Sequence, residues 1–330
     1  MNDFERPVCY EKRKAIPEVY SGVPTFLGVP RITSGEIDGQ DVVIVGAPWE
    51  GICTTGNYTG VELGPKSIRS VSLRYGGYLP EFDYDFFDDL KVGDLGDAPS
   101  FNGDIERTFE GIEAKLGEIY SRGKKTVCFG GDHSTSIPTL RALARQGKRI
   151  GVIHFDAHLD NLFAFHGTEK NARCSPFYRA YEIPEVVSVV HVGIRGPRNH
   201  PSGMKAAADH GARVITAPEL HRRGWEDVVG EVKERIWGKT DLVYVSICSD
   251  ALDVSSNPGG PADFGGLSSH QLLQMVHSFA SEGIAAFDFV EVYPPQDLNG
   301  ISSHVAAWAA IYAMNGMGMA KRNARRGTER

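Results

Sequence analysis

Four apolar segments of the chain end in clusters of acidic, imidazole or thiol side chains. The clusters are Asp132 and His133; Asp156, His158 and Asp160; Cys248, Asp250 and Asp253; and Asp288 and Glu291. In open α/β sheets, ligands bind beyond the carboxyl ends of the strands. If the apolar segments are strands of one sheet, we expect their polar ends to lie along one edge and to form one site.

The number of carboxylates in these clusters points to bound cations. Carboxylates that crowd together raise one another's pKa values unless positive charge lies among them, and these segment ends contain no lysine or arginine. A pair of divalent cations is the simplest source of that charge. Asp156, His158 and Asp160 alternate along an extended segment and so point to one side, where two bridged cations could share them. We expect Asp253 and Asp288 to hydrogen-bond the loops that follow them instead.

A thiol adds to the predicted ligand set. Cys248 and Asp250 are two residues apart at the end of the apolar segment LVYVSIC, so their side chains point to the same face of a strand. Oxygen and imidazole ligands suit Mn²⁺, Co²⁺, Ni²⁺ or Zn²⁺. The pattern therefore predicts a dinuclear metal site, with a thiol among carboxylates and imidazoles.

Composition excludes several other classes of protein. The 330 residues are 41% hydrophobic and 23% charged, with a net charge of −7, which does not favour a nucleic-acid partner. No apolar run approaches the roughly 20 residues of a membrane span. The first residues mix both charge signs without the apolar stretch of a secretory signal. We therefore expect a cytoplasmic protein without a membrane partner, and its five scattered cysteines are expected to be reduced thiols.

Segments of apolar, β-rich sequence alternate with segments of helical periodicity. Strands are predicted at 41–48, 125–131, 149–156, 186–194, 212–216, 242–248 and 285–292, and helices at 64–74, 104–121, 135–146, 224–237, 268–281 and 302–317. This alternation predicts an α/β fold in which helices cover both faces of a mainly parallel sheet. We expect a single domain over residues 1–330, with 1–40 as an irregular N-terminal arm and 319–330 as a polar tail.

Five segments of the chain resemble the signature stretches of the ureohydrolases, the arginase and agmatinase family. They are GGDHS (130–134), DAHLD (156–160), SICSDALD (246–253), PGGPADFGGLS (258–268) and FDFVEVYPP (287–295), with supporting matches at 46–69 and 191–196. The motifs occur in the family's order, and the resemblance extends from about residue 24 to residue 318. It implies a three-layer α/β/α arginase-like fold, assembly as trimers or hexamers, and hydrolysis of a guanidino group to urea and an amine.

The resemblance also implies a role for each site residue. His133, Asp156, Asp160 and position 248 would hold one metal ion, and Asp156, His158, position 248 and Asp250 would hold the other. Three residues would act in catalysis: Asp160 would orient the attacking hydroxide, Glu291 would pair with the substrate guanidinium, and His166 would shuttle protons.

The sequence departs from the family pattern at Cys248, where the family has an aspartate that bridges both metal ions. A thiolate is softer than a carboxylate and offers one donor atom instead of two, so it would favour Ni²⁺ or Co²⁺ over Mn²⁺. The alternative is a degenerate site with one metal ion or none.

A second departure lies in the loop after Asp160. His166 keeps the family's His-Gly-Thr tripeptide, but Ser-Pro-Phe comes later and follows Arg173 and Cys174. Either His166 is the proton shuttle, or Arg173 occupies that position and the shuttle is lost. An arginine cannot donate a proton near neutral pH, and it would repel a guanidinium. The segment GGPADFGG is also one residue shorter than the corresponding family loop and lacks its glutamate.

Two functions are compatible with these features. The first is a metal-dependent hydrolase of a guanidino or amidino compound, with alkylguanidines and biguanides among its candidate substrates, working as a homo-oligomer. The second is a non-catalytic helper subunit that supports an active paralogue in a hetero-oligomer. We expect Trp49, Tyr58 and the loop 161–175 to line the entrance of the pocket.

Overall fold

The computed structural model describes residues 22–52 and 58–328. Most of the predicted N-terminal arm, residues 1–21, lies outside the described residues. Eight strands form one parallel sheet in the order β4-β1-β5-β10-β9-β6-β7-β8. The strands are β1 (Val42–Ala47), β4 (Val92–Asp97), β5 (Lys125–Gly130), β6 (Ile150–Phe155), β7 (Val186–Ile194), β8 (Arg213–Thr216), β9 (Leu242–Cys248) and β10 (Ala286–Val290). A short antiparallel hairpin consists of β2 (Tyr78–Leu79) and β3 (Tyr84–Asp85).

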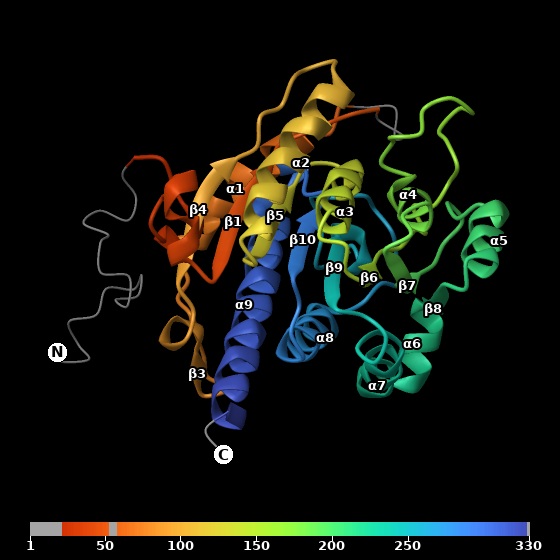
Figure 1. The fold of residues 1–330 in the computed structure, drawn as a ribbon. Coiled ribbons are helices and arrows are strands. Elements are labelled where there is room, and N and C mark those ends of the chain that lie inside the picture. The colour runs from red at the N-terminus through yellow and green to blue at the C-terminus, as the bar shows by residue number, and fades with distance from the viewer. Residues whose placement is uncertain (1–21, 53–57, 329–330) are drawn as a thin grey trace.

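Helices pack on both faces of this sheet (Figure 1). They are α1 (Gly64–Ser72), α2 (Ile105–Ser121), α3 (Ser136–Ala144), α4 (Pro176–Tyr181), α5 (Pro201–Asp209), α6 (Ala217–Arg223), α7 (Trp225–Ile236), α8 (Ser269–Ser281) and α9 (Ile301–Thr328). Among the described residues, no helix is both long enough and apolar enough to cross a membrane.

Alternate residues of the strands pack into two separate cores. In β1, Val43 and Val45 pack in the core that contains residues of α2, α3 and α4. Val42 and Ile44 pack on the opposite face, with residues of α1, α7, α8 and α9. Strands buried on both faces are nearly continuously apolar, which is why most of them were recognisable in the sequence. The three-layer α/β/α arrangement is confirmed.

The sequence did not reveal strand β4, because its residues VGDLGD are not an apolar run. The strand lies at one edge of the sheet. Asp94 is buried there because Arg69 of α1 donates to both of its carboxylate oxygens, at 2.8 and 3.0 Å. Three short helices, α4, α5 and α6, were also missed, and each begins with a proline within its first two residues.

The two ends of the described chain pack against this edge of the sheet. Residues 22–40 contain two short 3₁₀ helices, as expected for an irregular arm, and Phe26 and Leu27 are fully buried in the core. Residues 319–328 are polar, as predicted, but they continue helix α9 instead of forming a tail. Ion pairs stabilise this extension, because Lys321 pairs with Asp41 and Arg322 with Asp89.

The four strands that carry the predicted site residues are adjacent at the centre of the sheet. Strands β5, β10, β9 and β6 pair in that order, and all run in the same direction. The polar residues that follow them therefore meet at one edge, as the sequence predicted.

We expect Asp94→Ala to destabilise the fold by about 3–5 kcal/mol, because it removes the main partner of the buried Arg69 cation. The free energy of unfolding would be measured by urea titration followed by circular dichroism. The matched control is Arg122→Ala, which removes the surface pair with Glu118 and should cost about 1 kcal/mol or less. Equal losses in the two variants would contradict the assignment of this buried pair as a structural anchor.

Candidate metal centre

The loop after β5 is shaped by a close approach of the chain at Trp49. A Cβ atom on Gly131 would lie 1.9 Å from the carbonyl oxygen of Trp49, so only glycine fits there. The Asp132 amide donates to that same oxygen at 2.9 Å, and the Asp132 carboxylate accepts from the Gly51 amide at 2.7 Å. These contacts fix the backbone from which His133 points into the site.

Hydrogen bonds fix the orientation of the His133 ring. Its Nε2 is 3.1 Å from the hydroxyl of Ser246, which donates to Asp288 at 2.7 Å, so Nε2 is the donor to Ser246. Nδ1 then faces Asp156 at 3.1 Å and Asp160 at 2.9 Å. Burial disfavours a charge on this ring, but the two neighbouring aspartates raise the pKa of His133. The Nδ1 atom therefore needs a proton or a cation between itself and the carboxylates.

His158 has the same arrangement on the other side of Asp156. Its Nδ1 lies 3.3 Å from Asp156 and 3.1 Å from Asp250, and its Nε2 lies 3.4 Å from Asp263. Burial opposes a charge on the ring, yet Asp250 and the other carboxylates raise the pKa of His158. A ligand histidine that donates its second nitrogen to a carboxylate is typical of metal sites. Arg198 pairs with Asp263 and so fixes that partner.

A third buried imidazole, His154 of β6, holds the Asp156 carboxylate. His154 Nε2 lies 2.9 Å from Asp156, and its Nδ1 lies 2.8 Å from Nδ1 of His191, whose Nε2 is 2.7 Å from the Tyr181 hydroxyl. Burial lowers the pKa of His154 to about 4 and that of His191 well below its usual value. Because both rings are neutral, each can donate once and accept once, and His154 donates to Asp156.

Cys248 ends strand β9 and lines the same cavity as His158 and Asp250. It is buried, with a 2% exposed surface. Burial, together with the charges of Asp156 and Asp250, raises the pKa of the Cys248 thiol well above its usual value. A thiol in such surroundings loses its proton when it coordinates a metal ion.

Asp160 and Glu291 share an unusual backbone conformation. Both have a positive φ, 42° at Asp160 and 62° at Glu291, and backbone strain of this kind is concentrated at functional sites. Burial and the neighbouring Asp156 carboxylate raise the pKa of Asp160 to about 7. Glu291 is also buried, which raises its pKa, while Arg173 opposes the rise.

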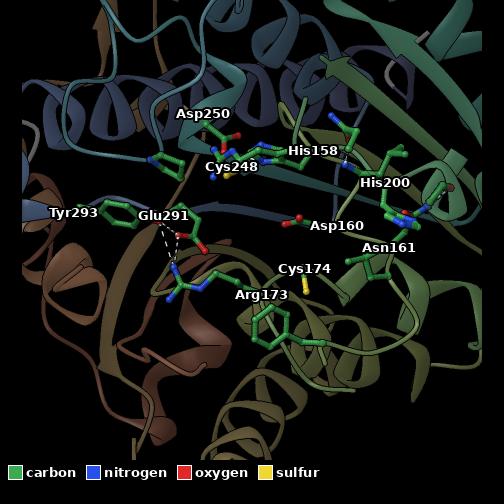
Figure 2. A pocket seen from close by; sticks show the side chains of 17 residues that line it. His158, Asp160, Asn161, Arg173, Cys174, His200, Cys248, Asp250, Glu291 and Tyr293 are labelled. Carbon is green, nitrogen blue, oxygen red and sulfur yellow. Dashed lines mark hydrogen bonds and ion pairs between the residues drawn. The ribbon is translucent and has the colours of Figure 1, made fainter. Parts of the chain in front are cut away.

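These residues border a cavity of about 240 Å³. Figure 2 shows His158, Cys248 and Asp250 on one side of it, and Arg173, Glu291 and Tyr293 on another. The remaining lining includes Asp160, Asn161, Phe165, Cys174, Asn199 and His200. Four of the six predicted ligand positions, His158, Asp160, Cys248 and Asp250, line the cavity. His133 and Asp156 lie behind them, with His133 2.9 Å from Asp160 and Asp156 3.3 Å from His158.

The loop 161–175 contributes Arg173 to the cavity, and His166 lies elsewhere. His166 is exposed, its ring contacts Phe165, and it is not among the described residues that line the cavity. Arg173 is buried and lies within 3.1 Å of Glu291. Of the two residues left open by the sequence, Arg173 lines the cavity and His166 does not.

Several smaller expectations have mixed outcomes. Trp49 is buried against Phe109 and Ile137 and packs in the interior instead of lining the cavity, and Tyr58 is exposed. Asp253 accepts from the amides of Ser255 and Gly265 in the following loop, as predicted. The expectation for Asp288 was wrong, because its carboxylate lies in the interior.

Asp288 accepts from the hydroxyls of Tyr244, Ser246 and Ser136 and so supports His133 through Ser246. Sequence reasoning also missed His154, His191 and Asp263. His154 could have been found, because it precedes Asp156 by two residues and so points to the same face of the strand. His191 and Asp263 come from other segments, and only the fold brings them to the site.

The donor set fits divalent cations. One oxygen or nitrogen atom each from Asp156, His158 and Asp250 lies within 4.8 Å of the others, and the same holds for His133, His154 and Asp156. His133 Nδ1 and Asp250 Oδ2 are buried and make no hydrogen bond among the described residues. Buried polar atoms without a hydrogen bond call for another partner, and here a metal ion would satisfy both.

Comparison with known proteins decides the family. The family model described as "Arginase family" matches residues 40–316. The chain belongs to the arginase family. This arginase-family chain is 33% identical to a guanidinopropionase from Pseudomonas aeruginosa over 93% of its own length and 94% of the relative's. It is 35% identical to an agmatinase from Edwardsiella ictaluri over 83% of its length and 87% of the relative's.

A solved structure shares the fold of the arginase-family chain. Proclavaminate amidino hydrolase from Streptomyces clavuligerus superposes with a TM-score of 0.82 at 29% identity, covering 92% of this chain and 99% of that one. The names of these relatives are those of guanidino-compound hydrolases. The arginase-like fold and the ureohydrolase resemblance are thereby confirmed.

We expect metal binding to tighten as the pH rises. The raised pKa values of His133 and His158 mean that both rings hold protons near neutral pH, and a metal ion must displace those protons. Between about pH 6.5 and about pH 8, the affinity for Ni²⁺ should rise about tenfold per pH unit for each proton released.

Isothermal titration calorimetry in two buffers of different ionisation enthalpy would measure both the affinity and the protons released. His270→Ala, which removes an exposed histidine on α8, is the control and should bind Ni²⁺ as the unaltered chain does. Binding that is strong but independent of pH would argue against a site built on these two rings.

Proposed function

We propose that this chain is a metal-dependent hydrolase that releases urea and an amine from a guanidino or amidino compound. The proposal is carried by one observation: predicted metal ligands and a predicted substrate-binding carboxylate border the same cavity. His158, Asp160, Cys248 and Asp250 border it as metal-ligand positions, and Glu291 borders it as a carboxylate for the substrate. The kinship with guanidino-compound hydrolases supports the same reaction class.

His133, Asp156, Asp160 and Cys248 would hold one metal ion, and Asp156, His158, Cys248 and Asp250 would hold the second. When bound, the two cations supply Lewis acidity that generates hydroxide from water near neutral pH. The soft thiolate of Cys248 would make this ligand set favour Ni²⁺ or Co²⁺ over Mn²⁺.

The residues of the chain then position the reaction. The Asp160 carboxylate, held beside His133 at 2.9 Å, would accept a hydrogen bond from the attacking hydroxide and so direct it toward the planar guanidinium carbon. Glu291 would pair with the guanidinium and orient its plane. Proton delivery to the leaving amine stays a prediction for His166, which lies outside the cavity lining in this conformation.

Alkylguanidines and biguanides are the substrates we would test first, in a cytoplasmic enzyme that forms trimers or hexamers. Phe165 and Tyr293 border the cavity, and apolar and aromatic walls suit substituents of that kind.

We expect Cys248→Asp to change which metal ion supports activity. The substitution would replace the thiol at position 248 by two oxygen donors, so Mn²⁺ should support urea release about tenfold better relative to Ni²⁺ than in the unaltered chain. Urea would be measured after loading with each metal ion separately, with agmatine, guanidinobutyrate, guanidine and substituted biguanides as substrates.

The control is Cys128→Ala, which removes a buried thiol of β5 that packs in the hydrophobic core. Its metal preference should be that of the unaltered chain. No urea from any pairing of metal and substrate, in protein that binds no metal, would overturn the proposed activity.

A helper role in a hetero-oligomer is the second candidate, and the Arg173 to Glu291 ion pair favours it. While the Glu291 carboxylate pairs with Arg173, it is not available to a substrate. We expect a co-expressed active paralogue to keep its activity when this chain carries Asp156→Ala, if the chain is a helper. Urea release by the purified complex is the measurement, and loss of activity in that variant would assign catalysis to this chain.

A further inference from the structure

The carboxylate of Glu291 has hydrogen-bond donors on both of its oxygens. Oε1 accepts from the backbone amide of His133 at 2.8 Å. Oε2 accepts from the Tyr293 hydroxyl at 2.5 Å and from Nη1 of Arg173 at 3.1 Å. Figure 2 shows the Arg173 side chain reaching across the cavity wall to this carboxylate. The group proposed to receive a substrate guanidinium therefore already has a guanidinium beside it.

The charges around Arg173 make this a cation-binding site. Nη2 of Arg173 lies 3.5 Å from Asp132 and 3.7 Å from Glu50, so three carboxylates surround one guanidinium. Those carboxylates are fixed by backbone donors, since Asp132 accepts from the Gly51 amide and Glu50 from the amides of Thr59 and Gly60. A cation at this place is held by a rigid anionic wall.

We propose that Arg173 is an internal substrate mimic, whose guanidinium occupies the guanidinium position of this site and excludes external guanidino compounds until it moves. This inference rests on the proposed function only for the identity of the competing ligand. Glu291 is 2% exposed and Arg173 5% exposed. In so confined a place a second guanidinium meets both the steric volume and the like charge of the first.

Arg173 therefore sets the specificity of the site. A guanidino compound must displace the arginine from Glu291 before it can bind there in the same manner. The displaced side chain would still have Asp132 and Glu50 as partners, so the exchange does not leave a buried cation without a counter-charge.

The test uses the guanidinium ion itself as the probe. In the full chain carrying Arg173→Ala, guanidinium chloride at about 10 mM should raise the melting temperature, and its affinity should exceed that of the unaltered chain about tenfold or more. Sodium chloride at the same ionic strength controls for salt. The double variant Arg173→Ala with Glu291→Gln should lose the gain, because the carboxylate that receives the ion is gone.

Two further variants keep the test decisive. Arg173→Met retains the length of the side chain without its charge, and it replaces the alanine variant if that protein does not fold. Arg179→Ala removes a different buried arginine, on α4, which bonds the Phe163 carbonyl and Glu182 outside the cavity lining. Guanidinium should not stabilise this variant more than the unaltered chain.

The proposal is overturned if the unaltered chain and the Arg173 variants bind guanidinium equally well, or if the gain survives Glu291→Gln. Neither measurement needs a metal ion or turnover, so the outcome is separate from that of the urea assay. An inactive chain whose Arg173 variant gains guanidinium binding would support the mimic and refute the hydrolase. An active chain whose Arg173 variant does not gain guanidinium binding would support the hydrolase and refute the mimic.

Discussion

Electrostatic balance at the carboxyl edge of four central strands is the constraint on which the site depends. Asp156, Asp160 and Asp250 are drawn together within hydrogen-bonding distance of two imidazoles, and this arrangement is stable only with protons or cations among them. The supporting residues are placed accordingly, because Ser246 and Asp263 hold the outer nitrogens of His133 and His158 and turn the inner nitrogens toward the carboxylates. A metal ion bound there would compete with protons for the same atoms.

The negative charges near Arg173 are balanced in a different way. Glu50, Asp132 and Glu291 are balanced by a guanidinium that the chain provides itself. One half of the site contains a His/Asp cluster that could hold metal ions, whereas the other half contains an arginine of the chain itself. Cys248 lines the cavity together with His158 and Asp250 of one half and with Arg173 and Glu291 of the other.

The sequence was sufficient to predict elements and site residues that follow from a local pattern. It was insufficient for those that depend on contacts between distant segments of the chain. Doubly buried strands such as β1 and β9 are continuous apolar runs, and this pattern alone places the residues after them on one edge of the sheet. Strand β4 could not be recognised, because Asp94 is tolerated in it only through Arg69, which lies far away in the chain. Arg173 was considered as an alternative to His166, but only the fold shows that it reaches Glu291. His191, which contacts His154, and Asp263, which contacts His158, likewise come from distant segments that only the fold brings to the site.

The left-handed backbone at Asp160 and Glu291 has a consequence for how this protein could change over time. Such a conformation costs about 1–3 kcal/mol for a residue other than glycine, and aspartate adopts it more readily than glutamate does. Glycine at position 291 would relax the backbone, but it would also remove the carboxylate that accepts from the His133 amide and the Tyr293 hydroxyl and that pairs with the buried Arg173. The strained backbone at Glu291 is therefore sustained by the contacts of its own side chain, so the acid and the fold around it would have to change together.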